Sequence, residues 1–458
     1  MNQEKFLRRL HGKAAQVYDR LRNTRLAGML LRLCVWCDAH SFFVQCVLIL
    51  LLRAALDVLY ISVLSPNYAY SGFTTTPEPL FYLCSWAGLL VFLPFFVWIG
   101  ELRSPSAMIV NFLNYLFFIP ATSFAGCYRC DTRFFVILLV FWAFLIFFQL
   151  RLPVLYLKKP ALHISKAIMI ALTVFSCLFV LYLSGRYTGF RLTLNFTDEY
   201  KYRLEAREYS LSTIAYYLLT MIPVVLCILL AYWTACKRWL IAAALIVVYM
   251  LRYSFDTQKA IFLMLLLILA CRFFYREWML RWISGLMLVF TTASITEEKI
   301  MGTFFLVANF VRRLMYLPVL LCTQYDSFFQ LNPQSLNRDG IMGKLSFHNI
   351  YSTAIPRIIG EYRGHPAENA NTGLLGDLFA NLPLFPGIVL LPLILVICFR
   401  MLDLTGHASR QRILVPLCFY YACSFLGGFW STTLLSNGFL LTCILLYLYP
   451  DKEASSHV

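Results

Sequence analysis

Charged residues are scarce in this sequence, at 14% of 458 residues against about a quarter in a typical soluble domain. Hydrophobic residues make up 60% of the chain and aromatic residues 17%. Runs such as FFVILLVFWAFLIFFQL (134–150) and AIFLMLLLILACRFF (260–274) have no polar face, so water cannot be their solvent. The composition therefore excludes a water-soluble globular protein and indicates a polytopic membrane protein.

Other common signals are missing too. The first 41 residues are basic and lack the early apolar stretch of a secretory signal peptide. We expect them to form a cytoplasmic tail or a helix lying on the membrane surface. The sequence shows no internal repeat and no low-complexity tract. The net charge of +16 does not indicate nucleic-acid binding, because Lys and Arg accumulate on the cytoplasmic loops of polytopic proteins.

Metal-binding motifs are lacking although the chain has 15 cysteines, most of them scattered within apolar runs. Two pairs have CxxC spacing, CVWC (34–37) and CYRC (127–130), and neither is followed by a second ligand pair. This argues against zinc. A disulfide between Cys127 and Cys130 is an open alternative if they face an oxidising compartment. We predict no metal and no cofactor.

The apolar segments predict an all-α polytopic fold with about twelve transmembrane helices, since a spanning helix needs roughly 20 apolar residues. They lie at 42–64, 80–99, 106–122, 133–150, 167–184, 212–235, 239–254, 260–274, 282–295, 382–400, 413–430 and 434–449. Both chain ends then fall on the same side. The short segments at 239–254 and 260–274 leave one alternative, a single re-entrant hairpin.

The positions of Lys and Arg predict the orientation. Five basic regions fall on one side, which the positive-inside rule makes cytoplasmic: 1–41, 151–166, 237–238, 272–281 and 400–412. The membrane domain then has a first part at 42–295 and a last part at 382–450. The first part includes a periplasmic loop at 185–211, and a large periplasmic loop at 296–381 separates the two parts. Residues 451–458 form a cytoplasmic tail.

Arginines in the two external loops run against this rule. The basic residues are Arg186, Arg191, Lys201, Arg203 and Arg207 in the first loop, and Arg312, Arg313, Arg338, Arg357 and Arg363 in the second. A guanidinium group binds phosphate through two parallel hydrogen bonds and keeps its charge. The set therefore predicts an anion site at the membrane surface. The alternative is a solvated loop whose arginines pair with Asp326, Asp339, Glu361, Glu368 and Asp377.

Two placements of charge within apolar segments are informative. The segment FFLVANFVRRLMYLPVLLCTQYDSFFQ (304–330) is apolar at helical spacing but has Arg312 and Arg313 in its middle. Each charge at the bilayer centre costs roughly 2.5–3.5 kcal/mol on insertion scales, so we expect a surface or re-entrant helix. In the first span, Arg53 and Asp57 lie four residues apart, and we expect them to pair.

Three motifs, in order, carry a family resemblance: YKYRLEARE (200–208), RRLMYLP (312–318) and IPRIIGEYRGHPAENANTGLLGDLFANLPLFPGIVLLPLIL (355–395). Over roughly 195–400 the chain resembles the oligosaccharide repeat-unit polymerases of bacterial envelopes, the Wzy-type polymerases of O-antigen, capsule and exopolysaccharide. That family often shows Ile-Pro-Arg, then Lys-Pro, then Asn-Thr. Here Gly364-His365-Pro366 stands where Lys-Pro is common, and Leu384-Phe385-Pro386-Gly387 where Asn-Phe-Gly is common.

The resemblance implies a multi-pass protein of the bacterial inner membrane, similar in fold to GT-C-like, polyprenyl-phosphate-dependent glycosyltransferases. The implied substrate is an undecaprenyl-pyrophosphate-linked oligosaccharide, polymerised at the periplasmic face. The implied partners are membrane lipids, a chain-length regulator and a flippase, with no nucleic acid. No DxD-like pair occurs in the external loops, so we expect a metal-independent reaction in which arginines stabilise the pyrophosphate leaving group.

Candidate site residues follow from this expectation. We assign Arg357, Glu361 and His365 to catalysis, with Glu361 or His365 as the base because both lie near Arg357 and Arg363. The residues expected to bind pyrophosphate or glycan are Arg203, Arg207, Arg312, Arg313, Arg363, His348 and Asp377. His348 and Asp377 are also bases by residue type.

Two other functions stay open. An O-antigen ligase-type transferase would share the arginines and the leaving group, and would differ in its acceptor. A transporter or flippase of lipid-linked oligosaccharides would suit twelve spans. Transporters, however, usually consist of two similar halves, and this chain shows no such repeat.

Overall fold

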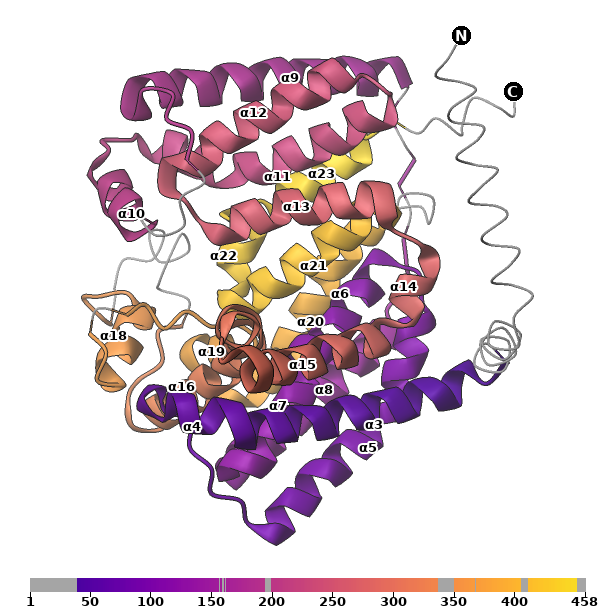
Figure 1. The fold of residues 1–458 in the computed structure, drawn as a ribbon, viewed down its shortest axis with the longest axis vertical. Helices are drawn as coiled ribbons and strands as arrows, with labels where there is room; N and C mark the ends of the chain where they lie inside the picture. The colour runs from indigo at the N-terminus through magenta and orange to yellow at the C-terminus, as the bar shows by residue number, and fades with distance from the viewer. Residues whose placement is uncertain are drawn as a thin grey trace.

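The computed structural model describes residues 39–155, 157–158, 160, 162–193, 199–336, 350–366, 368–404 and 411–450. These residues form helices and connecting loops, with no strand among them. The long helices run side by side, roughly at right angles to the longest axis of the molecule (Figure 1). They are α3 (Ser41–Leu59), α5 (Pro79–Glu101), α6 (Pro105–Leu113), α8 (Thr132–Arg151), α9 (Leu162–Leu183), α11 (Thr213–Ala235), α12 (Trp239–Asp256), α13 (Lys259–Phe274), α15 (Ile283–Met301), α20 (Leu384–Asp403), α21 (Gln411–Gly427) and α23 (Phe439–Leu448).

Shorter elements cluster at the ends of these helices. One end, on the left in Figure 1, is called here the α18 end. Its elements are α4 (Ser65–Tyr68), α10 (Glu199–Glu208), η6 (Val307–Tyr316), α16 (Leu317–Leu331), α18 (Ile355–Tyr362) and α19 (Leu375–Asn381). The opposite end carries α14 (Glu277–Arg281) and is called the α14 end.

The all-α, membrane-embedded character of the chain is confirmed. Nine helices in the described part of the chain are long and apolar enough to cross a membrane. Each of the twelve predicted segments coincides with helix, but three fall outside these nine: α13, α15 and α21. α13 and α21 have only 16 and 17 residues, and α15 ends in the charged residues Glu297, Glu298 and Lys299.

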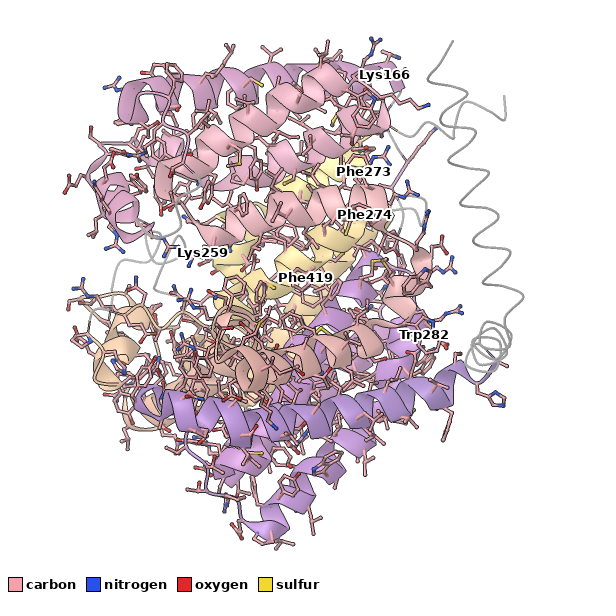
Figure 2. All side chains as sticks on the ribbon, in the orientation of Figure 1. Lys166, Lys259, Phe273, Phe274, Trp282 and Phe419 are labelled. Atoms are coloured by element: carbon pink, nitrogen blue, oxygen red, sulfur yellow. The ribbon has the colours of Figure 1, made fainter. Side chains whose placement is uncertain are left out.

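The basic loops predicted to share one side do lie at one end of the bundle. Lys166, Phe273, Phe274 and Trp282 lie at the α14 end, while Lys259 lies toward the other (Figure 2). Hydrogen bonds join these loops: the Tyr447 hydroxyl donates to the Lys158 carbonyl over 2.6 Å, and Arg400 donates to the Leu152 carbonyl over 3.1 Å. The basic segment 1–38 lies outside the described residues.

The helical run 105–129 occupies the centre of one half of the bundle. Its mean hydropathy is only 1.4, yet its most apolar stretch is entirely buried within the protein. Polar side chains in this run therefore face other helices instead of lipid. Trp142 of α8, for example, donates its indole N–H to the side-chain Oδ1 of Asn114 over 2.8 Å. A modest hydropathy here reflects internal partners, since a central helix need not match the surrounding lipid.

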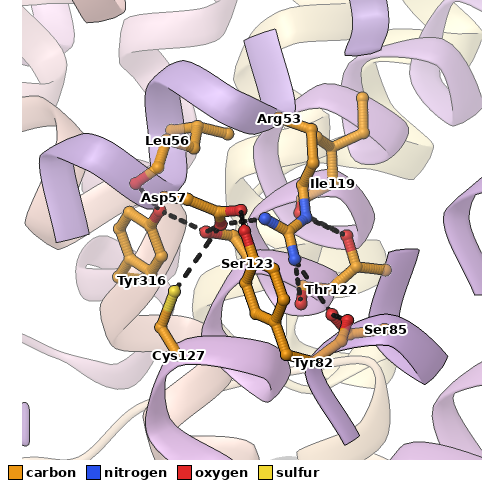
Figure 3. A network of polar contacts seen from close by, with 10 residues as sticks. All are labelled: Arg53, Leu56, Asp57, Tyr82, Ser85, Ile119, Thr122, Ser123, Cys127 and Tyr316. Carbon is orange, nitrogen blue, oxygen red and sulfur yellow. Dashed lines mark hydrogen bonds and ion pairs between the residues drawn. The ribbon is translucent and has the colours of Figure 1, made fainter. Parts of the chain in front are cut away.

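A buried polar network joins α3, α5, α7 (Ile119–Phe124) and η6, as Figure 3 shows. Arg53 is fully buried and pairs with Asp57, which confirms the pairing expected from their spacing. The remaining guanidinium donors of Arg53 reach Ser85 Oγ at 3.1 Å and the Thr122 side chain and carbonyl at 3.1 and 2.8 Å. The ion pair thus ties three helices together at one point.

The same network supplies hydrogen bonds to the Asp57 carboxylate and extends to η6. Asp57 accepts hydrogen bonds from the Ser123 hydroxyl at 2.6 Å and the Tyr82 hydroxyl at 2.7 Å. The Tyr316 hydroxyl, at the last residue of η6, donates to the Leu56 carbonyl over 3.0 Å. Cys127 also contacts Asp57, and both Cys127 and Cys130 are free thiols, so the alternative of a disulfide between them is wrong.

Asp57→Ala would leave the Arg53 charge buried without its counter-ion. We expect a loss of about 3–5 kcal/mol in the free energy of unfolding, measured by titrating the purified protein in mild detergent with a denaturing detergent. The control is Glu277→Ala, which breaks the exposed Arg103–Glu277 pair and should cost less than about 1 kcal/mol. Equal losses in the two variants would contradict the role given to the network.

Candidate functional site

The α18 end carries a ten-residue π-helix, η6, with the sequence VANFVRRLMY. π-helical turns are rare and are frequent at functional sites. The carboxylate of Glu297 anchors the start of this stretch by accepting backbone N–H groups of Phe305 and Leu306, each over 2.8 Å. Tyr316 anchors its end in the buried network. The arginine pair Arg312–Arg313 is therefore held at both sides, in agreement with a helix that packs in protein.

Arg312 and Arg363 come together although 50 residues separate them in the sequence. Arg312 stacks over the Tyr68 ring, with its guanidinium carbon 4.7 Å from the ring centroid. Arg363, directly after α18, donates from Nη2 to the Ser71 carbonyl over 3.1 Å. Tyr68 and Ser71 lie in the last turns of the first candidate span, Ser41–Ser71, so this helix end brings the two arginines together. Arg313 is exposed beside them.

Both guanidinium groups keep unused hydrogen-bond donors. Nε of Arg312, and Nε and Nη1 of Arg363, are buried and have no hydrogen-bond partner among the described residues. The nearest carboxylate, Glu368, lies 3.7 Å from Arg363 Nη1, an ion-pair contact too long for a good hydrogen bond. Buried polar donors are normally satisfied, so unpaired ones call for a specific explanation. A bound anion would supply the acceptors.

The charge balance favours an anion as well. The Arg363 side chain is only 3% exposed. Burial is the main cause that lowers the pKa of Arg363, Arg312 lowers it further, and Glu368 raises it again. Two cations close together, with Glu368 as the one carboxylate in ion-pair range of Arg363 among the described residues, leave an excess of positive charge in a partly desolvated place. An anion with several oxygens would relieve both the repulsion and the unmet donors.

α18 presents the other residues predicted for catalysis beside this cluster. Arg357 and Glu361 are exposed on α18, and His365 is half-buried just after it. Glycines make the packing here close. A Cβ on Gly360 would clash with the Glu368 carbonyl oxygen, and Gly364 has a left-handed φ of 79°. The glycines thus fold the chain back so that the backbone carbonyls of His365 and Glu368 lie against α18.

The predicted site residues of α10 lie elsewhere. In Figure 1, α10 packs beside α12 in the upper part of the molecule, whereas α18 packs on α16 in the lower part. Arg203 is half-buried on α10 and Arg207 is exposed. α10 is held by Arg191, which pairs with Glu205 at 2.8 Å and stacks on the Tyr202 ring at 4.0 Å. Arg203 and Arg207 therefore share the α18 end but lie apart from Arg312 and Arg363.

The remaining predicted site residues are Asp377 and His348. Asp377 is buried in α19, where its oxygens accept the Trp430 backbone N–H at 2.6 Å and the Asn381 amide at 2.7 Å. Both oxygens are thus engaged: the Trp430 contact joins α19 to α22 (Trp430–Leu435), and the Asn381 contact lies within α19. His348 lies outside the described residues. The alternative that nearby carboxylates neutralise the loop arginines applies in part to Arg363, whose Nη1 lies 3.7 Å from Glu368. Asp326 pairs instead with Arg133 of α8, at 2.8 Å.

Sequence reasoning missed Tyr68 and Ser71. The loop SPNYAYSGFTTTPEP (65–79) was used only for its lack of Lys and Arg. A signal was present, because aromatic residues in a segment without basic residues provide ring faces for cations from elsewhere. Only the fold shows which arginines approach them.

The comparisons with family models, with curated proteins and with solved structures found no match for this chain. Within the described ranges, no group of three or more His, Cys, Asp or Glu side chains lies close enough together to hold a metal ion.

Asp377 provides a pH test of this region. Burial is the main cause that raises its pKa from 3.8 to about 6, while hydrogen bonds from Trp430 and Asn381 oppose the rise. Between these values the folded state holds a proton that the unfolded state lacks, so this group's contribution to stability falls as the pH rises toward 6 and above. The effect is on the order of 1–3 kcal/mol.

We therefore expect the wild type to gain more stability than Asp377→Asn when the pH is lowered from 7.5 to 5. The thermal unfolding midpoint in detergent, measured at both pH values, checks this. The exposed Glu208→Gln serves as a control and should keep the wild-type difference. The same pH difference in wild type and Asp377→Asn would contradict the assignment.

Proposed function

We propose that this protein is a membrane glycosyltransferase. In this proposal it polymerises undecaprenyl-pyrophosphate-linked oligosaccharide repeat units into a surface polysaccharide at the periplasmic face of a bacterial inner membrane. The sequence resemblance to repeat-unit polymerases over 195–400 motivates the choice, and the all-α membrane fold is compatible with it.

One observation carries the proposal: the buried, unsatisfied donors of Arg312 and Arg363 at the α18 end. Their contacts Tyr68 and Ser71 lie at the end of the first candidate span, Ser41–Ser71. A pyrophosphate attached to a membrane-embedded polyprenyl chain sits at this depth, just outside the hydrocarbon. Its two phosphates offer several oxygens to the three free N–H positions, which matches the charge and the number of donors.

The proposed reaction is a group transfer. A hydroxyl oxygen of the acceptor glycan attacks the anomeric carbon of the donor glycan, a new C–O bond forms, and the bond to the pyrophosphate oxygen breaks. The hydroxyl proton passes to a base, and polyprenyl pyrophosphate leaves with the bonding electron pair. Negative charge grows on the leaving group, so preorganised guanidinium donors stabilise the transition state more than the ground state.

Glu361 and His365 are the candidate bases that fit this geometry best. Glu361 lies on α18 and His365 just after the helix, on either side of Arg363 in the sequence. Neither side chain is held in a buried network as Asp377 is. Arg357, on the same short helix, is placed to contact glycan or phosphate from the exposed side. Arg203 and Arg207 on α10 would contact more distant parts of a long glycan.

The first test is genetic. A host lacking the gene is complemented with wild type, Arg363→Ala, Arg312→Ala or Arg357→Ala at equal membrane levels, and its surface glycan is separated on a gel. We expect a ladder with wild type and single repeats with Arg363→Ala or Arg312→Ala, corresponding to a loss of at least about 100-fold, the scale for one transition-state donor. Arg276→Ala, an exposed arginine at the α14 end, should give the normal ladder.

The other outcomes separate the alternatives. Long glycan that accumulates on the carrier lipid without transfer to a lipid core would indicate a ligase and overturn the polymerase. Loss of all external lipid-linked repeats would indicate a transporter. A normal ladder with both Arg363→Ala and Arg312→Ala would refute the site.

Binding gives a second, independent test. Purified protein in detergent should be stabilised against heat by a short-chain polyprenyl pyrophosphate, and less by the monophosphate. Arg363→Lys keeps a charge but loses the planar pair of donors, so we expect it to bind the pyrophosphate about tenfold more weakly. Equal stabilisation of wild type and Arg363→Lys would contradict bidentate binding at Arg363.

A further inference from the structure

A cavity lies at the α14 end, far from Arg312 and Arg363. It has a volume of about 480 Å³, within the usual range for small-molecule sites. Its walls come from the C-terminal turn of α5, the following loop, Met108 of α6, Tyr275 and α14. α5 is a candidate span that ends at Glu101, so the cavity opens where the hydrocarbon would end.

The charges around this cavity are balanced. Glu101 and Glu277 supply two carboxylates, and Arg103 and Arg281 supply two guanidinium groups. Arg103 and Glu277 lie 3.2 Å apart, with side chains 60% and 64% exposed. Such an exposed pair contributes little to stability, so both partners can turn to a ligand at low cost. A ligand that carries one positive and one negative group would match these walls.

Different parts of the cavity wall favour ligand groups of different charge. The last carbonyl groups of the 23-residue helix α5 lie at Gly100–Leu102, and a helix C-terminus favours a cation. Glu101 lies on the same turn, so a cationic group fits there. Arg103 and Arg281 can accept an anionic phosphate. Aromatic rings complete the lining, with Tyr275 buried and Trp278 half-exposed, and rings attract ammonium groups.

The surroundings supply a place for acyl chains. Phe273, Phe274 and Trp278 expose large apolar surfaces at this end of the bundle, and Figure 2 shows Phe273 and Phe274 there. Aromatic side chains at this depth are typical of the membrane–water interface. A molecule with a zwitterionic head in the cavity could therefore lay its tails along these residues.

We propose that this cavity is a specific binding site for the headgroup of a zwitterionic phospholipid with a primary ammonium, such as phosphatidylethanolamine. Arg103 and Arg281 bind its phosphate, and Glu101 and Glu277 accept hydrogen bonds from its ammonium group. A quaternary ammonium has no N–H to donate to these carboxylates, which disfavours phosphatidylcholine. An anionic headgroup leaves the carboxylates unpaired and repelled. The site is independent of the proposed transferase reaction.

Native mass spectrometry of the full-length protein tests this. The protein is released from detergent with equal amounts of phosphatidylethanolamine, phosphatidylcholine and phosphatidylglycerol, and the first bound lipid is counted. We expect phosphatidylethanolamine to be favoured by about fivefold over each of the others. Glu277→Gln leaves Arg103 without its carboxylate, so we expect the preference to invert toward phosphatidylglycerol. Trp278→Leu should weaken phosphatidylethanolamine without favouring phosphatidylglycerol.

Glu208→Gln, an exposed carboxylate on α10, removes the same charge far from the cavity and should keep the wild-type preference. No preference of the wild type for phosphatidylethanolamine would overturn the proposal and indicate ordinary surrounding lipid. A preference that Glu277→Gln leaves intact, or that Glu208→Gln changes equally, would place the bound lipid elsewhere and would overturn it too.

Discussion

Hydrocarbon offers no hydrogen bonds, and this constraint governs every polar side chain inside the helical bundle. Arg53 shows the consequence most clearly. Its guanidinium group is fully buried, and Asp57, Ser85 and Thr122 receive its donors. Arg400 at the other end obeys the same rule, donating to Asp403 and to two backbone carbonyls near the end of α8. Each of these arginines joins helices that are distant in the sequence, although Nε of Arg400 has no hydrogen-bond partner among the described residues.

Compared with these two, Arg312 and Arg363 make fewer hydrogen bonds within the described part of the chain: Nε and Nη1 of Arg363 and Nε of Arg312 have no partner. They are buried enough to lose most of their hydration, yet Tyr68 and Ser71 satisfy only part of each group. A buried donor without a partner carries an energetic cost in the empty protein. An anion that binds here removes this cost and so gains affinity, because the donors are already oriented and need little reorganisation. The Figure 3 network supports this arrangement indirectly, since Tyr316 fixes the helix that carries Arg312.

The two ends of the bundle thus offer different chemistry to the two membrane faces. The α18 end gathers cations with few counter-ions near them, and so favours a ligand of high negative charge. The α14 end places carboxylates and guanidinium groups in one cavity, and so favours a ligand without net charge. A lipid-linked substrate at one face and a bulk membrane lipid at the other would each meet the matching set.

The sequence by itself determined the membrane character and the helical class, because burial in lipid demands long apolar helices whatever surrounds them. Helix occurs at all twelve predicted segments, and nine of the described helices are long and apolar enough to cross a membrane. It also determined the Arg53–Asp57 pair, since four residues on a helix bring two side chains to one face. Local spacing carries no information about partners from distant segments. Only the tertiary structure decided that Arg312 meets Arg363 through the Tyr68 turn, that Arg203 and Arg207 stand apart, and that Asp377 is occupied by Trp430. Those contacts join residues that are 50 or more positions apart in the sequence. Such residues meet only through the packing of the whole bundle.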